Sequence, residues 1–205
     1  MVCFDLGGVL ARINRCWQHA AETANVTTSL PAEPLLPLTD ITCFDAFQAG
    51  ELGLSDYLDG LGRTLGITFD EALAVHNSIL IGPYKGTEQM ILALRRAGFQ
   101  TGCLSNTNAP HWEALLSHSH FPGIAALDAK MASHEAKLQK PGEEIFRHFE
   151  ATYGLQPKEI VFFDDAAKNI LAAAACGWRA HLIDHEVDTA PQMIRALESE
   201  GIILI

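Results

Sequence analysis

The amino-acid sequence predicts an α/β protein in which a parallel sheet is covered by helices on both faces and carries an all-helical insertion. Three observations support this prediction. Short apolar segments ending in polar residues recur along the chain, amphipathic helical patterns separate them, and one long region shows no strand pattern. Alternating strands and helices favour a parallel sheet, because parallel strands need a crossover connection between them.

The strands are predicted from the apolar segments. "VCFD" ends at Asp5, "FQTGCLSN" at Ser105, "IVFFDD" at Asp164 and "RAHLID" at Asp184. Open α/β sheets bind their ligands beyond the carboxyl ends of the strands. We therefore expect the functional site where these polar strand ends meet.

The helices of the core are predicted from start and stop signals. "TEQMILALRRAG" stops at Gly98, and "PGEEIFRHFEATYG" begins with Pro141 and early acids and ends at Gly154. The Ala-rich "AAKNILAAAACG" closes at Gly177. Each of these segments follows or precedes a predicted strand, as a covered parallel sheet requires.

The helical insertion runs from about Asn14 to Ile81, where we find no convincing strand. "CFDAFQAGELGLSDYLDGLGRTLGI" and "TFDEALAVHNSIL" indicate helices, with Ser55 and Thr68 as N-caps, and "SLPAEPLLPL" indicates a loop or a break between helices. The segment "IGPYKG" returns the chain to the core. This divides the chain into a core of residues 1–13 and 82–205 and a helical unit of residues 14–81.

The composition narrows the classes of partner. Net charge is −11, from 14 Lys and Arg against 25 Asp and Glu, without a basic run. Nucleic acids and anionic membrane surfaces are therefore not expected as partners. An anionic substrate would need a local positive centre, such as a metal ion or a single lysine. The sequence carries no signal for an oligomeric state.

The cysteines and the apolar runs indicate a cytoplasmic protein. The five cysteines show no C-x-x-C spacing, and Cys3 and Cys103 lie in predicted strands, which suits buried thiols in a reducing compartment. The apolar start is too short for a signal peptide, and no run is long enough to span a bilayer. The nine histidines, including His118 and His120 in "HSHF", show no metal-ligand pattern and are interpreted as surface residues.

Acidic side chains at the strand ends suggest phosphate chemistry with a metal ion. Asp5, Asp164 and Asp165 would repel one another at one sheet edge without a cation, and a hard, oxygen-binding ion such as Mg²⁺ would relieve that repulsion. Asp5 would then be free to act as a covalent nucleophile that forms an aspartyl phosphate.

Further groups near these acids could bind the phosphoryl oxygens. Lys140 offers a fixed positive charge and Ser105 a hydroxyl, although Ser105 could equally cap the helix that starts near Ala109. Gly7 and Gly8 expose the backbone beside Asp5, so the N–H groups around Leu6 and Gly7 could hold oxygens of a phosphoryl group.

Four segments, in this order, resemble the four motifs of the haloacid dehalogenase-like superfamily: "FDLGGVL", "LSNTN", the lysine of "QKPGEEIF", and "FFDDAAKNI". The resemblance spans residues 2–185. It implies a Rossmann-like three-layer core and an all-helical cap domain between the first two motifs. "FQAGELGLSDYL" is also similar to the cap sequence of a subgroup that contains sugar-phosphate phosphatases.

The resemblance implies a metal site at the strand ends. Asp5 would be the nucleophile and a direct Mg²⁺ ligand, and Gly7 would contribute its backbone carbonyl. Asp165 would bind the ion directly, and Asp164 would act through water or by orienting neighbours.

The resemblance also implies roles in binding the phosphoryl group. Ser105 and the backbone N–H of Asn106 would bind it, and Lys140 would neutralise both Asp5 and the phosphoryl charge. Together these residues indicate a Mg²⁺-dependent phosphatase acting on a small phosphorylated metabolite, with a sugar phosphate as the candidate substrate.

The sequence departs from the superfamily pattern at Gly7. Most phosphatases of the superfamily have a second Asp there as general acid and base, and its absence costs about 10²–10⁴ in rate. Three explanations remain open: a good leaving group, a proton relay through the cap or the substrate's own hydroxyls, or a site with poor turnover. The alternatives are therefore a catalytically weak or inactive phosphate-binding or partner-binding protein, and a 2-haloacid dehalogenase using Asp5.

Overall fold

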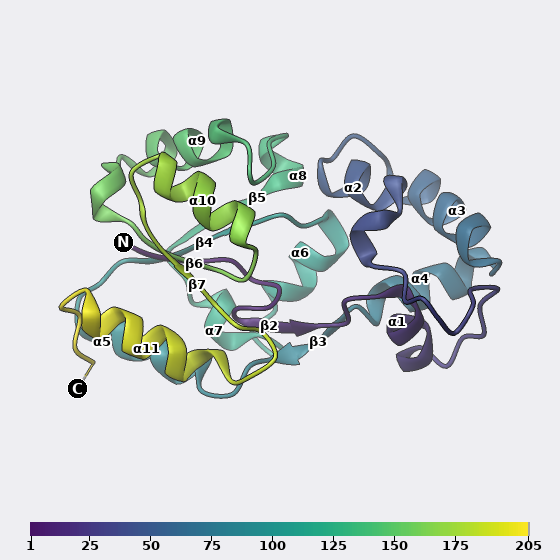
Figure 1. Cartoon of the computed structure of the whole chain (residues 1–205), viewed down its shortest axis with the longest axis horizontal. Coiled ribbons are helices and arrows are strands. Elements are labelled where there is room, and N and C mark those ends of the chain that lie inside the picture. The colour runs from purple at the N-terminus through teal and green to yellow at the C-terminus, as the bar shows by residue number, and fades with distance from the viewer. Residues whose placement is uncertain (205) are drawn as a thin grey trace.

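Five parallel strands form the central sheet of the computed structural model, which describes residues 1–204 (Figure 1). Their order across the sheet is β5-β4-β1-β6-β7, so that β1 lies in the middle. Every pairing within this sheet is parallel. The predicted α/β class with a Rossmann-like core is confirmed. The strands are β1 (Val2–Phe4), β4 (Thr101–Ser105), β5 (Ala129–Ala132), β6 (Val161–Asp164) and β7 (Arg179–Leu182).

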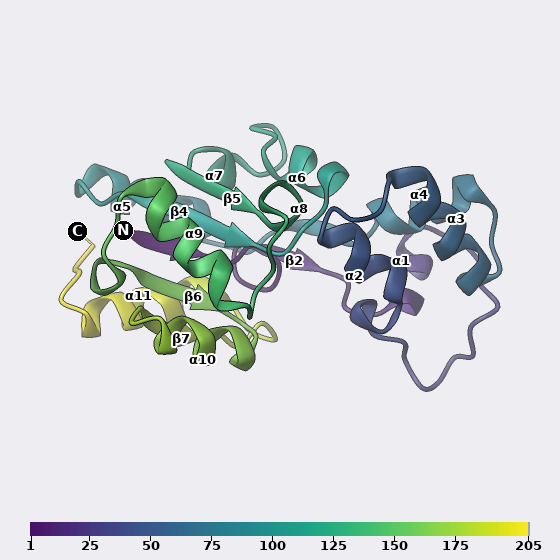
Figure 2. The same ribbon diagram turned by 90° about the horizontal axis from the view of Figure 1, so that it is seen from above.

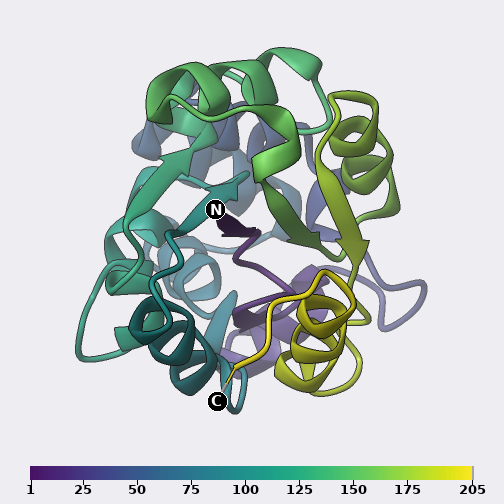
Figure 3. The ribbon, with the colours of Figure 1, turned by 90° about the vertical axis from the view of Figure 1, so that its left-hand side faces the viewer.

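Helices cover both faces of this sheet, as two further views show (Figures 2 and 3). They are α5 (Thr87–Arg96), α6 (Ala109–Leu115), α7 (Pro122–Ala125), α8 (Ser133–Ala136), α9 (Glu143–Tyr153), α10 (Ala167–Ala175) and α11 (Thr189–Ser199). Because side chains alternate along a strand, Cys3 and Phe162 pack against α9 and α10, whereas Phe4 and Phe163 pack with α5, α6 and α11. A bilayer-spanning helix is absent from residues 1–204, where none reaches the required length and hydrophobicity.

Four helices form a separate unit beside the core (Figure 1). They are α1 (Trp17–Thr23), α2 (Thr42–Gln48), α3 (Leu54–Leu65) and α4 (Phe69–Asn77). The unit has its own apolar centre, in which the fully buried Trp17 meets Phe44 edge-on at 5.4 Å between ring centroids. The boundaries 14–81 and 1–13 with 82–205 remain our prediction for the two domains.

A two-stranded antiparallel ribbon connects the helical unit to the core. It pairs β2 (Ala11–Ile13) with β3 (Leu80–Pro83), and Ile13 lies opposite Leu80. The expectation that no strand occurs between about Asn14 and Ile81 was therefore wrong, since β3 starts inside that region. Both strands are too short, and β3 too interrupted by Gly82 and Pro83, for a recognisable period of two.

Three other local predictions were also wrong. Strand β5 was missed, because "AKMA" is a short edge segment that continues directly into α8. Strand β7 ends at Leu182 rather than at Asp184. Helix α3 begins after Gly53, so Ser55 lies inside the helix and is not its N-cap.

The N-cap predicted at Thr68 is confirmed, and it is part of a capping box. The Thr68 hydroxyl accepts a hydrogen bond from the backbone N–H of Glu71, and the Glu71 carboxylate accepts one from the backbone N–H of Thr68 at 2.8 Å. The cap satisfies two backbone donors that α4 could not satisfy by itself.

Replacing Thr68 tests this cap. Thr68→Ala should lower the free energy of unfolding by about 1 kcal/mol, because the Glu71 N–H loses its acceptor. Thr64→Ala is the matched control, since Thr64 is exposed in the interior of α3 and its hydroxyl only bonds the carbonyl of Gly60. Urea unfolding monitored by circular dichroism measures both, and equal losses in the two variants would contradict the assignment.

Candidate active site

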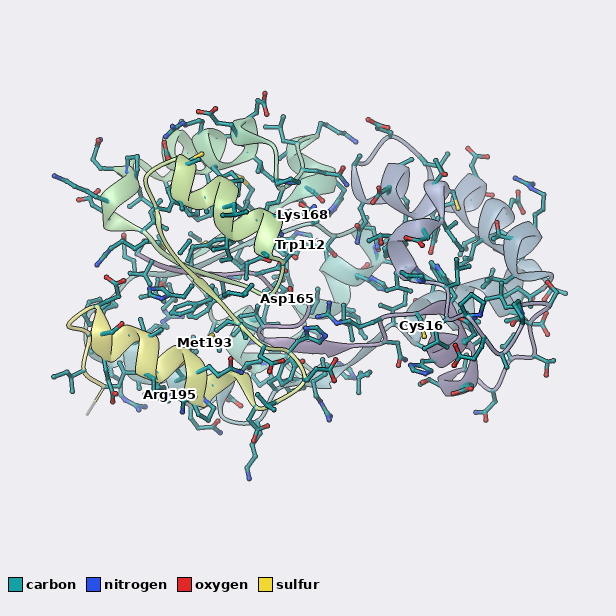
Figure 4. The ribbon with its side chains drawn as sticks, viewed as in Figure 1. Cys16, Trp112, Asp165, Lys168, Met193 and Arg195 are labelled. Carbon is teal, nitrogen blue, oxygen red and sulfur yellow. The ribbon has the colours of Figure 1, made fainter. Side chains whose placement is uncertain are left out.

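The predicted acids come together at the carboxyl edge of the central sheet. Asp5 follows β1, Asp164 ends β6, and Asp165 comes next; β1 and β6 are direct neighbours in the sheet. Each of the three offers a carboxylate oxygen within 4.8 Å of the others. Asp165 lies on the side of the core that faces the helical unit (Figure 4).

A buried lysine joins two of these acids. The ammonium Nζ of Lys140 lies 2.9 Å from Asp5 Oδ1 and donates a hydrogen bond to Asp164 Oδ2 at 2.7 Å. Its side chain is 1% exposed, which makes an unpaired charge there very costly. Burial alone would lower the pKa of Lys140, but Asp164 and Asp5 raise it well above its usual range. Its two carboxylate partners therefore favour the charged form of the lysine.

Asp5 is held in a less favourable environment. Burial raises the pKa of its carboxyl group to about 6, against the lowering effect of Lys140, and the charges of Asp164 and Asp165 raise it further. Although Asp5 Oδ1 forms the ion pair with Lys140, it is buried and accepts no aligned hydrogen bond. This oxygen is therefore poorly compensated by the protein itself.

Both carboxylate oxygens of Asp164 accept hydrogen bonds from other groups of the protein. Its Oδ1 accepts hydrogen bonds from the backbone N–H of Ala166 and from Asn169 Nδ2, and its Oδ2 accepts from Lys140 and again from Asn169. The side chain is fully buried. This arrangement suits a residue that positions Lys140 rather than one that offers free oxygens. Sequence reasoning missed Asn169, for which the only signal was an amide near the start of the helix after the two acids.

Asp165 lies close to basic side chains from two other segments. Its Oδ2 accepts a hydrogen bond from Arg15, which precedes α1, and His185 Nδ1 lies 3.6 Å away in the segment after β7. From the sequence alone Arg15 could contact the substrate, but the more common case, a solvated arginine, was favoured. Instead it is a half-exposed guanidinium that connects the entrance of the helical unit to the acid cluster.

The turn after Asp5 presents backbone donors. Its backbone hydrogen bonds use the N–H groups of residues 8–11, and among the described residues those of Leu6 and Gly7 have no backbone acceptor. Gly8 has φ +82°, a conformation that residues with a Cβ rarely adopt. At Gly7 a Cβ would meet only the flexible side chain of Ile13, at 3.1 Å. The open N–H groups lie where an anion bound at Asp5 could accept hydrogen bonds.

Ser105 and Asn106 lie at the end of the neighbouring strand β4. Ser105 is 3% exposed and does not cap the next helix, because Asn108 accepts the hydrogen bond from the backbone N–H of His111. The Asn106 side chain donates to the carbonyl of Lys140 and accepts from the Lys140 N–H, both at 2.9 Å. Asn106 thus fixes the loop that carries the buried lysine, a function that the sequence did not reveal.

The cluster fits a divalent cation. Three carboxylates face two cations, Lys140 and Arg15, which leaves one net negative charge. All donors are oxygen atoms, which a hard ion such as Mg²⁺ prefers, and Asp5 Oδ1 is buried with the ion pair to Lys140 but without an aligned hydrogen bond. Asp5, Asp165 and the Gly7 carbonyl are the groups that could hold the ion.

A cavity of about 440 Å³ opens at this sheet edge, between the core and the helical unit. The core contributes Gly7, Ser105 and Asn106, and helix α2 contributes Phe44 and Gln48. The two bodies touch at its rim, because Ser133 Oγ donates a hydrogen bond to the backbone carbonyl of Gln48. A ligand bound at the acid cluster would therefore extend toward the helical unit.

Two histidines were not placed correctly from the sequence. His118 and His120 are exposed as expected, but His76 and His111 are buried and their rings stack at 4.0 Å between centroids. Burial lowers the pKa of His111 to about 4, and burial together with His111 lowers that of His76 well below its usual value. Both rings are neutral parts of the contact between α4 and α6.

Residues 1–177 match the model of a protein family that is described as "Hydrolase: haloacid dehalogenase-like hydrolase". The chain belongs to the haloacid dehalogenase-like hydrolases. The resemblance of the four motifs, from "FDLGGVL" to "FFDDAAKNI", is thereby confirmed, and the cluster described above occupies the positions of these motifs.

Proteins similar to this chain include two that are named as phosphatases. Phosphatase MT3486 of Mycobacterium tuberculosis is 28% identical over 215 residues, which cover 99% of this chain and 95% of the relative. Sesquiterpene phosphatase astK of Aspergillus oryzae is 24% identical, covering 88% of each chain.

Solved structures of the family share the fold. A HAD family enzyme of Bacteroides thetaiotaomicron, in a magnesium complex, superposes with a TM-score of 0.78 at 25% identity, over 94% of this chain and 96% of that one. The L-2-haloacid dehalogenase of Xanthobacter autotrophicus has a TM-score of 0.61 at 19% identity, over 98% of this chain and 83% of that one. This second likeness extends to the fold alone.

Gly8 should be the least replaceable residue of the turn. In Gly8→Ala the new Cβ would collide with the Arg15 guanidinium and with Asp165, in addition to the backbone cost of about 1–2 kcal/mol at positive φ. Gly98→Ala is the matched control, because Gly98 has φ +84° and a Cβ added there would meet nothing within 4 Å. Urea unfolding should show a clearly larger loss for Gly8→Ala, and equal losses would contradict the close approach.

Asp5 should destabilise the metal-free protein at neutral pH. Because the folded-state pKa is raised from 3.8 to about 6, the folded state binds more protons than the unfolded state between these values, and stability falls as the pH rises through them. In EDTA, Asp5→Asn should be more stable than the wild type by about 1–3 kcal/mol above pH 6, and this gain should shrink toward pH 4. Thermal unfolding across this range measures it, and a gain independent of pH would contradict the proposed charge effect.

Proposed function

We propose that this hydrolase is a Mg²⁺-dependent phosphatase that hydrolyses a small phosphorylated metabolite through an aspartyl-phosphate intermediate on Asp5. The observation that carries the proposal is the placement of Asp5. Its carboxylate lies against the buried Lys140 ammonium and beside Asp164 and Asp165, at the end of the central strand. Relatives named as phosphatases support the same activity.

In the first step an Asp5 carboxylate oxygen attacks the phosphorus atom. An O–P bond forms to Asp5 while the ester O–P bond breaks, and its electron pair leaves with the alcohol oxygen. The N–H groups of Leu6, Gly7 and Asn106 and the Ser105 hydroxyl can donate to the phosphoryl oxygens as they move. Lys140 stays protonated and balances the charge on Asp5 and on the transferring group.

Mg²⁺, held by Asp5, Asp165 and the Gly7 carbonyl, would supply the remaining positive charge for the carboxylates and the phosphoryl oxygens. Hydrogen bonds within the protein orient the acid cluster before the substrate binds. Asn169 and Ala166 orient Asp164, which positions Lys140.

In the second step water attacks the phosphorus atom of the aspartyl phosphate. The bond between phosphorus and the Asp5 oxygen breaks, which releases inorganic phosphate and regenerates the carboxylate. Gly7 carries no acid or base for either step, so the leaving alcohol takes its proton from solvent or from another group. We propose that the helical unit of residues 14–81 is a cap that limits the access of water during this cycle.

A phosphatase fits the site better than the alternative of a 2-haloacid dehalogenase. Dehalogenase chemistry has no need for a cation, whereas the three carboxylates of the acid cluster exceed the charges of Lys140 and Arg15 by one. The cytoplasmic location and the sugar-phosphate substrate stay predictions from the sequence. The five cysteines are free thiols, which agrees with a reducing compartment.

Release of inorganic phosphate from a panel of small phosphate monoesters tests the proposal. We expect turnover with Mg²⁺ that EDTA abolishes, and no turnover above background in Asp5→Asn. Lys140→Ala should lower kcat/KM by about 10²–10³, because a preorganised charge is lost. His118→Ala is the control, since His118 is exposed and lies outside the cluster.

Two results would overturn the proposal. One is the absence of phosphate release from every ester of the panel with Mg²⁺ present, which would favour a phosphate-binding or partner-binding protein. The other is turnover of 2-haloacids in EDTA that depends on Asp5, which would establish the dehalogenase instead.

A further inference from the structure

The cavity that Gly7, Ser105 and Asn106 help to line at the sheet edge differs from what a sugar phosphate requires. Resting on the proposed phosphatase activity, we propose that the substrate is a phosphate monoester of an apolar alcohol, without hydroxyl groups beyond the ester. Its phosphate would lie at Gly7 and Ser105, and its hydrocarbon group would extend into the cavity of about 440 Å³ that these residues help to form. This volume is within the range for small ligands.

Hydrocarbon side chains form most of the wall away from the sheet edge. Ile13 and Leu80 lie opposite each other on the connecting ribbon, so their side chains share one face, and both line the cavity. The helical unit adds Leu38 and Phe44, and Ile79 precedes the ribbon strand β3. An alkyl group bound among these side chains would be removed from water on several sides.

The polar side chains of the wall are largely committed to the protein. The Arg15 guanidinium donates to Asp165. Of the His111 nitrogens, Nε2 is 2.9 Å from the carbonyl of His76, and Nδ1 is 3.3 Å from Asn108 Nδ2. The Asn106 side chain is bonded to the backbone of Lys140 on both sides.

Few groups therefore remain to bind the hydroxyls of a sugar. No carboxylate lines the cavity in the part of the chain that the structure describes. Among its polar side chains, Thr39 and Gln48 donate long hydrogen bonds of 3.5 Å, to Asp40 and to the Asn106 carbonyl, and the Thr107 hydroxyl is uncommitted. A hydroxyl buried without a hydrogen-bond partner is strongly disfavoured, whereas each buried methylene is favourable. The wall thus selects against polyols and for hydrocarbon chains.

A series of n-alkyl phosphates measures this selection while the leaving group stays nearly constant. With Mg²⁺, kcat/KM should rise about threefold to fourfold per methylene from ethyl to hexyl phosphate, the equivalent of about 0.8 kcal/mol per buried methylene. The matched pair is cyclohexylmethyl phosphate and glucose 6-phosphate, which have similar size. The first should be the better substrate by at least about a hundredfold, because several hydroxyls of the second would be left unpaired.

A variant connects the selection to the cavity wall. Leu80→Asn places an amide of similar size on the wall and should reduce the ratio of kcat/KM for hexyl over ethyl phosphate at least about fivefold. Leu171→Asn is the matched control, because Leu171 is 72% exposed on α10 and outside the cavity. It should retain the wild-type ratio.

The outcomes separate this inference from the proposed function. The apolar substrate is overturned if kcat/KM does not rise from ethyl to hexyl phosphate, or if glucose 6-phosphate is turned over faster than cyclohexylmethyl phosphate. Either result would leave the Mg²⁺- and Asp5-dependent phosphatase activity intact. The absence of turnover for every ester overturns the proposed function. If Leu80→Asn does not fold, the wild-type series alone still decides, since it requires no variant.

Discussion

The buried ammonium of Lys140 is the interaction on which the site depends. It is 1% exposed and lies within 2.9 Å of two carboxylates that belong to neighbouring strands. The ammonium and the two carboxylates compensate one another, because a buried charge without an opposite charge beside it is strongly disfavoured. The surrounding bonds preserve this geometry: Asn106 holds the lysine's loop and Asn169 orients Asp164. The mutual compensation is incomplete at Asp5, which is the residue proposed to react.

Function and stability are opposed at Asp5. Burial raises its pKa, so the charged form needed for attack on phosphorus is maintained against the preference of the fold. Such poorly compensated groups are common at active sites, where the surrounding structure holds them. The acid cluster also keeps one net negative charge. A divalent ion that binds together with a phosphoryl group would balance this charge. The charge of the site is thus balanced only when the proposed metal ion and the phosphoryl group are bound.

The core carries the reacting groups of the proposed phosphatase, and the helical unit forms much of the surface that would select the substrate. The sheet edge carries the charged groups, whereas the helical unit and the ribbon β2–β3 supply the apolar wall of the cavity. The core and the helical unit join at the ribbon and at contacts such as Ser133 with Gln48, and Arg15 is the residue of the helical unit that contacts the acid cluster. The apolar side chains of the cavity wall belong to other positions, so they can differ without removing this contact.

The sequence by itself determined the α/β class, and it predicted that Asp5, Ser105 and Asp164 lie at strand ends and that Asp5, Asp164 and Asp165 meet at one edge of the sheet. It could do so because strand ends and helix caps are local patterns, and because parallel strands bring their carboxyl ends to one edge whatever their separation in the chain. Only the tertiary structure decided which partners these residues receive. The contacts of Arg15 with Asp165 and of Asn106 with Lys140 join segments more than thirty residues apart, as does the stacking of His76 on His111. The apolar character of the cavity is likewise a property of three segments packed together, and no single stretch of sequence contains it.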